Sequence, residues 1–379
     1  MYCAVSSSCW GLLHYRWEPT KGRVLIRTLI VSLVSLVVFL AIFMLPVEAA
    51  DLLLFPSVTA THQSITDAEL PDKKFVPAVD IFYSTEFNHA FFLAEYLASS
   101  NENELERIQL GWHILPGKTL WLGRFHNGIS FWNTQTHHGD FLQSSLTRPS
   151  IANYEDEFGP LPAHISGFLL ESTRTAGDAE INYTAGIGIG PTYDSTLHPL
   201  DLLNPQHPGK LAASFRLGYH PEAGNPDQFG AALGYARIPV RNILQINEVR
   251  QSILSTFLNI ERNKFHLIGE LFVFHNHVLA VTNATTYRTV SAYLQPEYRL
   301  GESGRTTLYG RVESTPNAER DQYLALFPEF SRSQVVVGLR FDLTPSQALK
   351  IEAGKSHRLD PNELHINFIS AQWSMILPL

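Results

Sequence analysis

The feature that most constrains this chain is a repeated alternation of apolar and polar residues in segments of about ten, running from about residue 75 to Leu379. In Thr307–Ser314, one face carries Tyr309, Arg311 and Glu313, while the other carries Leu308, Gly310 and Val312. Because successive side chains of a strand point to opposite faces, the pattern predicts strands with one charged and one apolar face. A soluble sandwich and a barrel with a wet lumen share this alternation, so a second observation must separate them.

The N-terminus provides that observation. An apolar run, Leu29–Leu45, is interrupted only by Ser32 and Ser35, follows a basic stretch at 21–27 and precedes small residues. A basic leader, an apolar core and a small-residue cleavage position predict a secretory signal, cut after Ala49. We therefore expect residues 1–49 to be an N-terminal extension with a signal peptide, and residues 50–379 to form one exported barrel domain. An uncleaved anchor helix is the alternative reading of the apolar run.

The remainder of the chain lacks the features of other membrane and secreted classes. Both cysteines, Cys3 and Cys9, precede residue 50, so the exported part has no disulfide. It has no second apolar run of the roughly 20 residues that a membrane helix needs. Removing residues 1–49 takes away four basic and two acidic side chains, which changes the net charge from −8 to −10 and argues against nucleic acid as a partner.

The connections between the alternating segments are of two kinds. We expect short turns at Leu115–Lys118, Thr175–Asp178, Pro221–Gln228, Glu261–Lys264, Gly301–Arg305 and Thr344–Gln347. We expect long connections at 131–163, 191–209, 236–250, 275–287, 314–332 and 356–364. Short periplasmic turns alternating with long extracellular loops are typical of outer-membrane barrels. The prediction is thus an all-β, transmembrane antiparallel β-barrel in the outer membrane of a Gram-negative bacterium.

The segments between these connections predict about 16 strands, an even number that leaves both termini on the periplasmic side. The two weakest segments are Leu52–Thr59 and Phe75–Ser84. Without them the barrel would have 14 strands, and the sequence leaves both numbers open.

Two passages resemble bacterial porins. Residues 122–133, Leu-Gly-Arg-Phe-His-Asn-Gly-Ile-Ser-Phe-Trp-Asn, resemble the strand-to-loop passage of substrate-selective porins, and the last strand resembles the C-terminal signal read by the barrel-insertion machinery. The resemblance to the porin superfamily covers the whole exported part. It implies a channel for passive diffusion of small hydrophilic solutes, with outer-membrane lipid, the insertion machinery and the solutes as partners, and a homotrimer as the common assembly of that superfamily.

The predicted lumen face carries charges of both signs. We expect a wet interior, because a charged lumen excludes a dry packed core and a 16-stranded barrel is wide enough for an aqueous channel. Two interpretations of these charges are open. Charges of opposite sign on facing walls would orient solutes in the pore. Alternatively, ion pairs such as Arg311 with Glu313 would only stabilise the wall. Lumen-facing charges expected on the strands are Arg124, His126, Arg216, His266, Glu270, Glu297, Arg299, Arg311, Glu313, Arg340, Asp342, Lys350 and Glu352.

The longest connection, 131–163, is the best candidate for function because loops of this length are usually functional or disordered. Its aromatic residues and prolines favour a compact conformation. One long loop of a porin folds into the barrel and narrows it, and the resemblance implies the same here. The charged loop residues that we expect at this constriction are His137, His138, Asp140, Arg148, Glu155, Asp156 and Glu157.

Three other interpretations of the sequence were considered. His126, His137, His138 and His164 suggest metal binding, but their spacing matches no compact motif, so we expect no metal or other cofactor. An outer-membrane lipase- or protease-like enzyme would need a nucleophile and a base. Ser144 with Asp140 and either His137 or His138 could supply them, but the spacing of these residues matches no specific catalytic motif. We therefore expect no enzyme. A surface barrel that transports nothing is the third interpretation.

Overall fold

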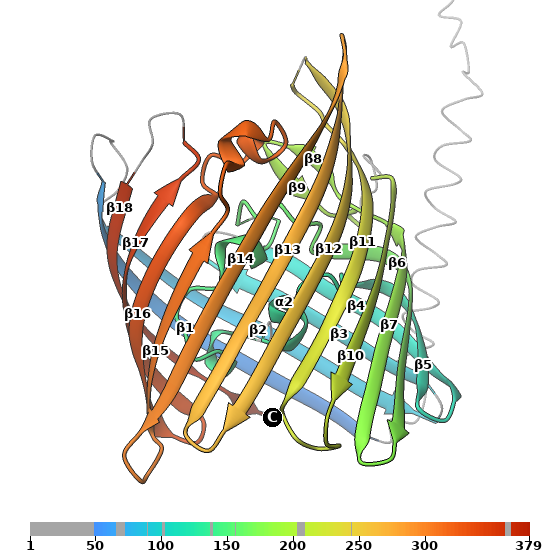
Figure 1. Ribbon diagram of the computed structural model, residues 1–379. Coiled ribbons are helices and arrows are strands. Elements are labelled where there is room, and N and C mark those ends of the chain that lie inside the picture. The colour runs from blue at the N-terminus through green and yellow to red at the C-terminus, as the bar shows by residue number, and fades with distance from the viewer. Residues whose placement is uncertain are drawn as a thin grey trace, which may run out of the picture. The chain divides into compact units, whose positions relative to one another are not determined.

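In the computed structural model, sixteen long antiparallel strands form one closed barrel (Figure 1). The structure describes residues 49–65, 73–88, 90–100, 103–136, 139–155, 157–202, 209–243, 245–360 and 365–379. The predicted signal peptide, except Ala49, lies outside these residues. The barrel strands are β1 (Ala49–Ile65), β2 (Lys73–Phe87), β3 (Ala90–Ser99), β4 (Asn103–Leu115), β5 (Lys118–His126), β6 (His164–Ala176), β7 (Ala179–Ile189), β10 (Leu211–His220), β11 (Gln228–Pro239), β12 (Ile246–Arg262), β13 (Phe265–Ala280), β14 (Ala284–Leu300), β15 (Thr306–Ser314), β16 (Ser331–Thr344), β17 (Gln347–Arg358) and β18 (His365–Met375).

The first and last strands close the barrel. β1 pairs along β18, with Ala60 opposite Ala371, and also pairs with the short β19 (Leu377–Pro378). Both strands that the sequence indicated least clearly, β1 and β2, belong to the wall. The count of 16 is therefore confirmed over 14. A separate hairpin of β8 (Thr192–Asp194) and β9 (Thr196–His198) lies in the connection between β7 and β10.

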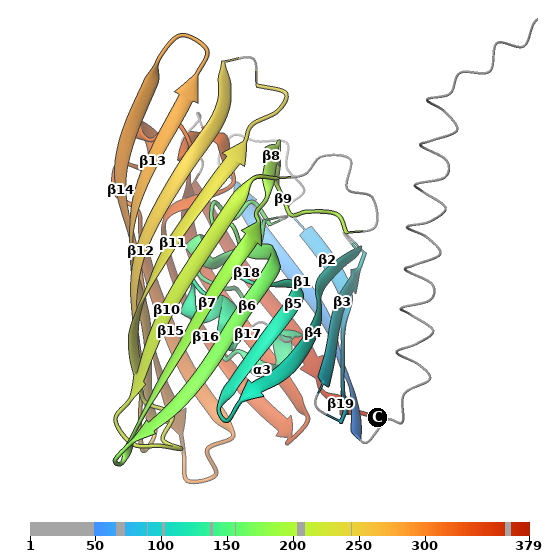
Figure 2. The same cartoon turned by 90° about the vertical axis from the view of Figure 1, so that its right-hand side faces the viewer.

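Short turns gather at one end of the barrel, at the bottom of Figure 1, as predicted. Two of the expected long connections are wrong, because β11 and β12 are joined by residues 240–245 and β13 and β14 by residues 281–283 only. The strands instead continue far past the opposite rim (Figure 2). Inward-facing Phe274 and Val278 explain the extension: they pack in one cluster with Tyr323 and Phe327 of the β15–β16 connection, so apolar burial supports strands beyond the wall.

The two faces of the strands have the arrangement predicted for a barrel. On β16, Val335 and Val337 are 57% and 55% exposed on the outer face. On β17, Lys350 and Glu352 face inward and are 1% and 0% exposed. Apolar side chains outside and ionic side chains inside reverse the order of a soluble protein, and this is the arrangement required by a wall with lipid around it.

The expectation that a charged lumen excludes a packed core is wrong for one side of the barrel. Between β10–β14 and the β5–β6 connection, the interior holds a packed cluster that includes Phe131, Trp132, Phe257 and Phe272, all buried. Alternation predicts which positions face inward, but several inward positions of β12 and β13 are apolar, such as Ile253 and Phe272. Among the described residues, the cavity on the opposite side of the lumen is lined mainly by polar and charged residues. In the described residues, no helix is both long and apolar enough to span a bilayer.

Candidate functional site: the inward loop and its cavity

The connection between β5 and β6, residues 127–163, folds into the barrel and is called the inward loop below (Figure 2). It contains the short helices α2 (Phe131–Gln135) and α3 (Gly139–Leu142) and the 3-10 turn Ser150–Ala152. Its two ends are joined at the wall, since the Asn127 backbone N–H donates to Ala163 O (2.7 Å) and the Asn127 side chain to Pro162 O (2.8 Å). The loop therefore enters and leaves the wall at one point.

The first part of the loop is fixed to β10–β14. The buried Glu270 carboxylate accepts from the backbone N–H groups of Phe131 and Trp132 at the N-terminus of α2, where unpaired donors need an acceptor. The Phe131 ring stacks on Phe257, with centroids 4.7 Å apart. The Arg216 guanidinium lies over both rings. These contacts fill this side of the lumen with packed side chains.

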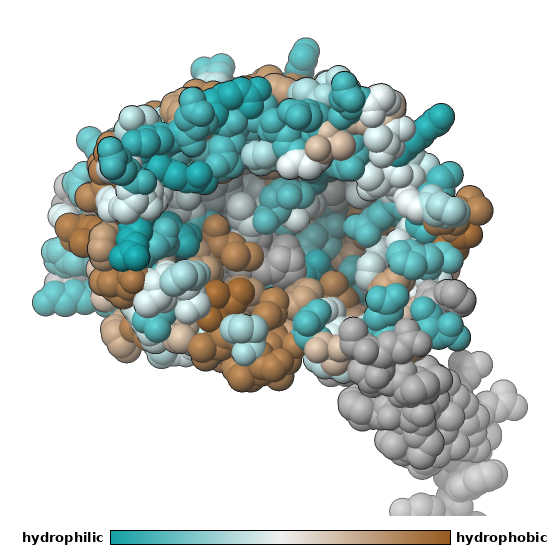
Figure 3. Space-filling model, turned by 90° about the horizontal axis from the view of Figure 1, so that it is seen from below, coloured by the Kyte–Doolittle hydropathy of each residue, from teal (hydrophilic) through white to brown (hydrophobic). Residues whose placement is uncertain are grey.

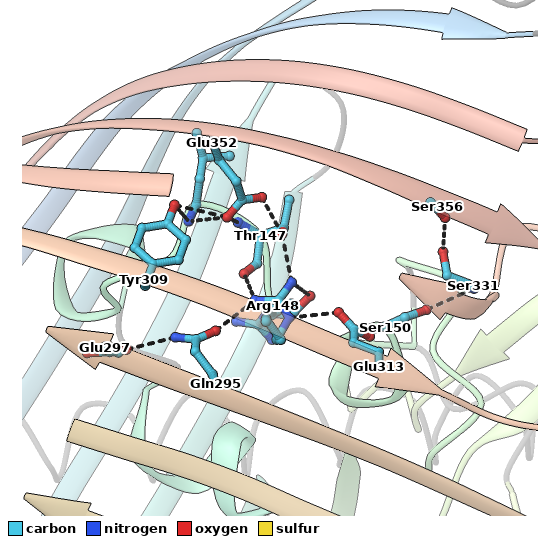
Figure 4. Close-up of polar contacts among 12 residues, drawn as sticks. Thr147, Arg148, Ser150, Gln295, Glu297, Tyr309, Glu313, Ser331, Glu352 and Ser356 are labelled. Carbon is cyan, nitrogen blue, oxygen red and sulfur yellow. Dashed lines mark hydrogen bonds and ion pairs between the residues drawn. The ribbon is translucent and has the colours of Figure 1, made fainter. Parts of the chain in front are cut away.

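The middle of the loop is fixed to β14, β15 and β17 by buried ions (Figure 4). Arg311 Nη1 donates to Thr147 O (2.8 Å), its Nη2 donates to Arg148 O (3.0 Å), and its Nε donates to Glu313 (2.7 Å). Glu352 accepts from the Leu146 N–H (3.0 Å) and from Thr147 Oγ1 (2.6 Å). The wall charges thus satisfy loop backbone groups that would otherwise be buried without partners.

The helix α3 is held to β1 and β16–β18. Asp140 accepts from Ser57 Oγ and from Gln372 Nε2, both at 2.8 Å. Lys350 donates to the carbonyl oxygen of Asp140, and Arg340 donates to that of Gln143 (3.0 Å). The inward loop is therefore anchored on both sides of the barrel and is fixed across the lumen.

A cavity of about 630 Å³ remains between the loop and the wall formed by β1–β3 and β16–β18. Seen from the end with the short turns, the molecule is hollowed at its centre, with mostly hydrophilic residues along much of the rim (Figure 3). The cavity lining carries six carboxylates and three basic side chains, which gives a formal charge of −3. These charged residues are Asp80, Glu95, Glu106, Asp140, Glu157, Glu329, Lys74, Arg148 and Arg358.

Hydroxyl and amide groups from β1 and β18 form the opposite surface of this cavity. Ser57, Thr59, Thr61 and Gln63 lie on one face of β1, and Gln372 Nε2 donates to Thr59 Oγ1 (2.9 Å). Sequence reasoning missed these residues because only charges were considered. Their signal was the polar residue at every second position from 57 to 63.

The predicted site residues fall into several groups in the structure. Asp140, Arg148 and Glu157 line the cavity. Glu270, Glu297, Arg311, Glu313, Arg340, Lys350 and Glu352 hold the loop backbone or loop side chains, and Arg216 contacts Thr134. Arg124, His126 and Glu155 lie near one another at the outer ends of β4–β6. His266 pairs with Glu297, Asp342 pairs with Arg340, and Arg299 pairs with Glu261 near the short-turn end. His137, His138 and Asp156 lie outside the described residues.

Of the alternative enzyme site, the described residues Ser144 and Asp140 have separate hydrogen-bond partners. Ser144 donates to Glu297 (2.8 Å), whereas Asp140 accepts from Ser57 and Gln372. Ser144 is therefore bonded to β14, whereas Asp140 is bonded to β1 and β18. The two histidines of that interpretation lie outside the described residues.

Comparison with solved structures identifies the architecture. Salmonella typhi OmpF in complex with daunomycin matches with a TM-score of 0.57 and 9% identity, covering 86% of this chain and 97% of that chain. The anion-selective porin of Comamonas acidovorans matches with a TM-score of 0.56 and 9% identity over 87% and 100%. The trimer form of OmpT, an outer membrane protein of Vibrio cholerae, matches with 0.52 and 9% over 86% and 100%. No family model and no curated protein matches the sequence. At this identity the likeness shows the fold, a porin-like outer-membrane β-barrel.

Proposed function

We propose that the chain is an outer-membrane porin of a Gram-negative bacterium, exported by the signal within residues 1–49, in which small hydrophilic solutes diffuse through the cavity beside the inward loop. One observation carries the proposal: a polar cavity of about 630 Å³ lies inside a barrel whose outer face is apolar. A barrel serving only as a surface scaffold would not need a polar cavity walled by a firmly anchored loop. The porin-like fold agrees with this function, and the trimeric neighbour favours a homotrimer.

The lining charge suggests which solutes pass. With a formal charge of −3, the cavity favours cations and neutral polar solutes over anions, because charged rings in a pore set ion preference. The hydroxyl and amide groups of β1 and β18 would replace part of a solute's hydration shell. Arg148 and Glu157, whose charged groups lie 4.0 Å apart, stand at the loop side of the same passage.

Single-channel recording of the purified protein in a planar bilayer tests the proposal. We expect defined conductance steps and a reversal potential of cation-selective sign in a salt gradient. Deleting residues 134–160 removes most of the inward loop and should raise the conductance. An unchanged conductance would exclude a role of this loop in narrowing the channel. The control is Val281→Asn at the tip of the β13–β14 hairpin, where the side chain is 65% exposed, and it should conduct like the parent. Absence of channels would favour the surface barrel, and hydrolysis of ester or peptide substrates would favour the enzyme.

A further inference from the structure

Two imidazoles and a carboxylate meet on the lumen face of three adjacent strands, outside the contacts that hold α2 and α3. His126 at the end of β5 is the cross-strand partner of His164 at the start of β6. The register of β4 against β5, with Ile108 opposite Arg124, brings Glu106 to the same row. Side chains in one row of neighbouring strands lie within reach of one another. The fold therefore builds this cluster from residues 20 and 38 positions apart on either side of His126.

The geometry of the cluster approaches that of a metal site. One ligand atom from each of Glu106, His126 and His164 lies within 4.8 Å of the other two, and all three residues are buried. Glu106 Oε2 and His164 Nε2 are 3.1 Å apart. In a tetrahedral zinc site with bonds of about 2.1 Å, ligand atoms are about 3.4 Å apart. Small side-chain rotations would bring the set to that spacing.

A carboxylate from the inward loop orients one of the imidazoles. Glu155 Oε2 lies 2.6 Å from His164 Nδ1, and its other oxygen accepts from the His164 backbone N–H (3.2 Å). A carboxylate on one ring nitrogen fixes the tautomer and leaves the other nitrogen, here Nε2, for a metal. The Tyr154 ring covers the same histidine, with ring centroids 5.7 Å apart. The cluster therefore contains, besides three candidate ligands, a carboxylate, Glu155, that holds His164 in place.

The charges of the surroundings also favour a divalent cation. Glu106 and Glu155 both contact His164, and beside them Arg124, next to His126 on β5, pairs with a third carboxylate, Glu104. Without the two imidazoles, these four side chains sum to −2, the charge that a divalent ion balances. Glu106 also lines the cavity, which provides an entry path for the ion.

We propose that Glu106, His126 and His164 bind a divalent transition-metal ion of the zinc class, with Glu155 as the positioning residue. Two imidazoles and a carboxylate suit Zn²⁺ and its neighbours better than Ca²⁺ or Mg²⁺, which prefer oxygen ligands. Three protein ligands leave one position for water from the cavity. Because Glu155 belongs to the inward loop, the bound ion would tie the loop to β4–β6. This inference does not depend on whether the barrel conducts.

Metal titration of the detergent-solubilised full-length protein, stripped with a chelator, tests the site. Zn²⁺ binding is followed by calorimetry, and Co²⁺ is used as a probe whose visible absorption reports four-coordinate geometry. We expect one tight equivalent of Zn²⁺ that displaces Co²⁺. His126→Gln and Glu106→Gln should each lose at least tenfold in affinity together with the Co²⁺ absorption, and Glu155→Gln about 10- to 100-fold in affinity.

The matched control is His266→Gln. His266 also pairs with a lumen carboxylate, Glu297, at 3.0 Å, but no second histidine belongs to that pair in the described residues. This variant should bind Zn²⁺ like the parent, and the heat-dependent gel mobility of each variant checks that the barrel has folded. No tight equivalent in the parent, or equal affinity in folded His126→Gln and Glu106→Gln, would overturn the proposal and leave the cluster as a hydrogen-bonded ion network.

Discussion

Replacement of Arg311 by Met should release the inward loop without opening the wall. The Arg311 side chain is fully buried, and three of its hydrogen bonds go to the loop: to Thr147 O, Thr147 Oγ1 and Arg148 O, at 2.8–3.0 Å. Its Nε also neutralises Glu313 at 2.7 Å, so the substitution leaves a buried carboxylate without its cation. Breaking a buried ion pair in this way costs about 3–5 kcal/mol. At about 1.4 kcal/mol per factor of ten, the undocked population of the loop should rise roughly 10²- to 4 × 10³-fold.

A cysteine at position 145 reports that population. Ser145 is fully buried in the loop, and Ser145→Cys changes its volume little. The other two cysteines of the chain, Cys3 and Cys9, are replaced by serine. If undocking exposes the thiol faster than the reagent consumes it, the rate of maleimide labelling is proportional to the undocked fraction. Arg311→Met should therefore accelerate labelling roughly 10²- to 4 × 10³-fold.

The double variant Arg311→Met/Glu313→Gln separates charge from packing. It removes both ions, so the penalty of an unpaired buried carboxylate disappears and the labelling rate should fall back toward that of the parent. Equal labelling rates in parent, single and double variants, all with folded barrels, would refute the argument that this ion pair holds the loop.

Three further outcomes follow from the wall and the outer loops. Val337→Lys, on the lipid face, should cost about 2–4 kcal/mol and reduce the yield of heat-modifiable barrel, whereas Gln334→Lys, which faces the cavity on the same strand, should insert normally. Gly123→Ala should lower the thermal midpoint of unfolding, because this residue has φ +144° and a Cβ would lie 2.0 Å from Ile108 O; Gly310→Ala, with a nearest atom at 3.6 Å, should not. Burial raises the pKa of Asp321, so the β15–β16 connection is most stable below the ordinary carboxyl pKa and loses that stability as the pH rises through the raised value. Amide exchange of residues 318–327, corrected for intrinsic rates, should therefore be faster at neutral pH than in acid, and a pH difference that persists in Asp321→Asn would contradict this cause.

The sequence predicts the wall well because each strand carries its own signal. Period-two alternation assigns the lipid face residue by residue, and turn residues such as Pro116 and Gly117 separate the hairpins. It predicts the extended β13–β14 hairpin poorly. His275, His277 and Arg288 resemble loop residues, and only the distant partners Tyr323 and Phe327 explain why the strands continue.

The site was predicted in part. Alternation indicates that Arg311, Glu313 and Glu352 face inward, but it cannot distinguish a side chain that lines water from one that holds a loop. That difference depends on where the backbone of Leu146–Arg148 lies, which no local pattern specifies. Among the residues of the proposed metal site, the sequence suggested His126 and His164 but not Glu106, and their spacing gave no motif. Spacing along the chain is uninformative when the candidate ligands come from three strands.

The way in which the inward loop is anchored also has a consequence for the assembly of the barrel. Its backbone N–H groups donate to carboxylates that lie 138 to 206 residues further along the chain, from Glu270 for Trp132 to Glu352 for Leu146. Contacts of such sequence separation form late and slowly. The inward loop must therefore stay inside the growing, still open sheet until the last strands have been added. Its final docking and the pairing of β1 with β18 then occur together, late in assembly.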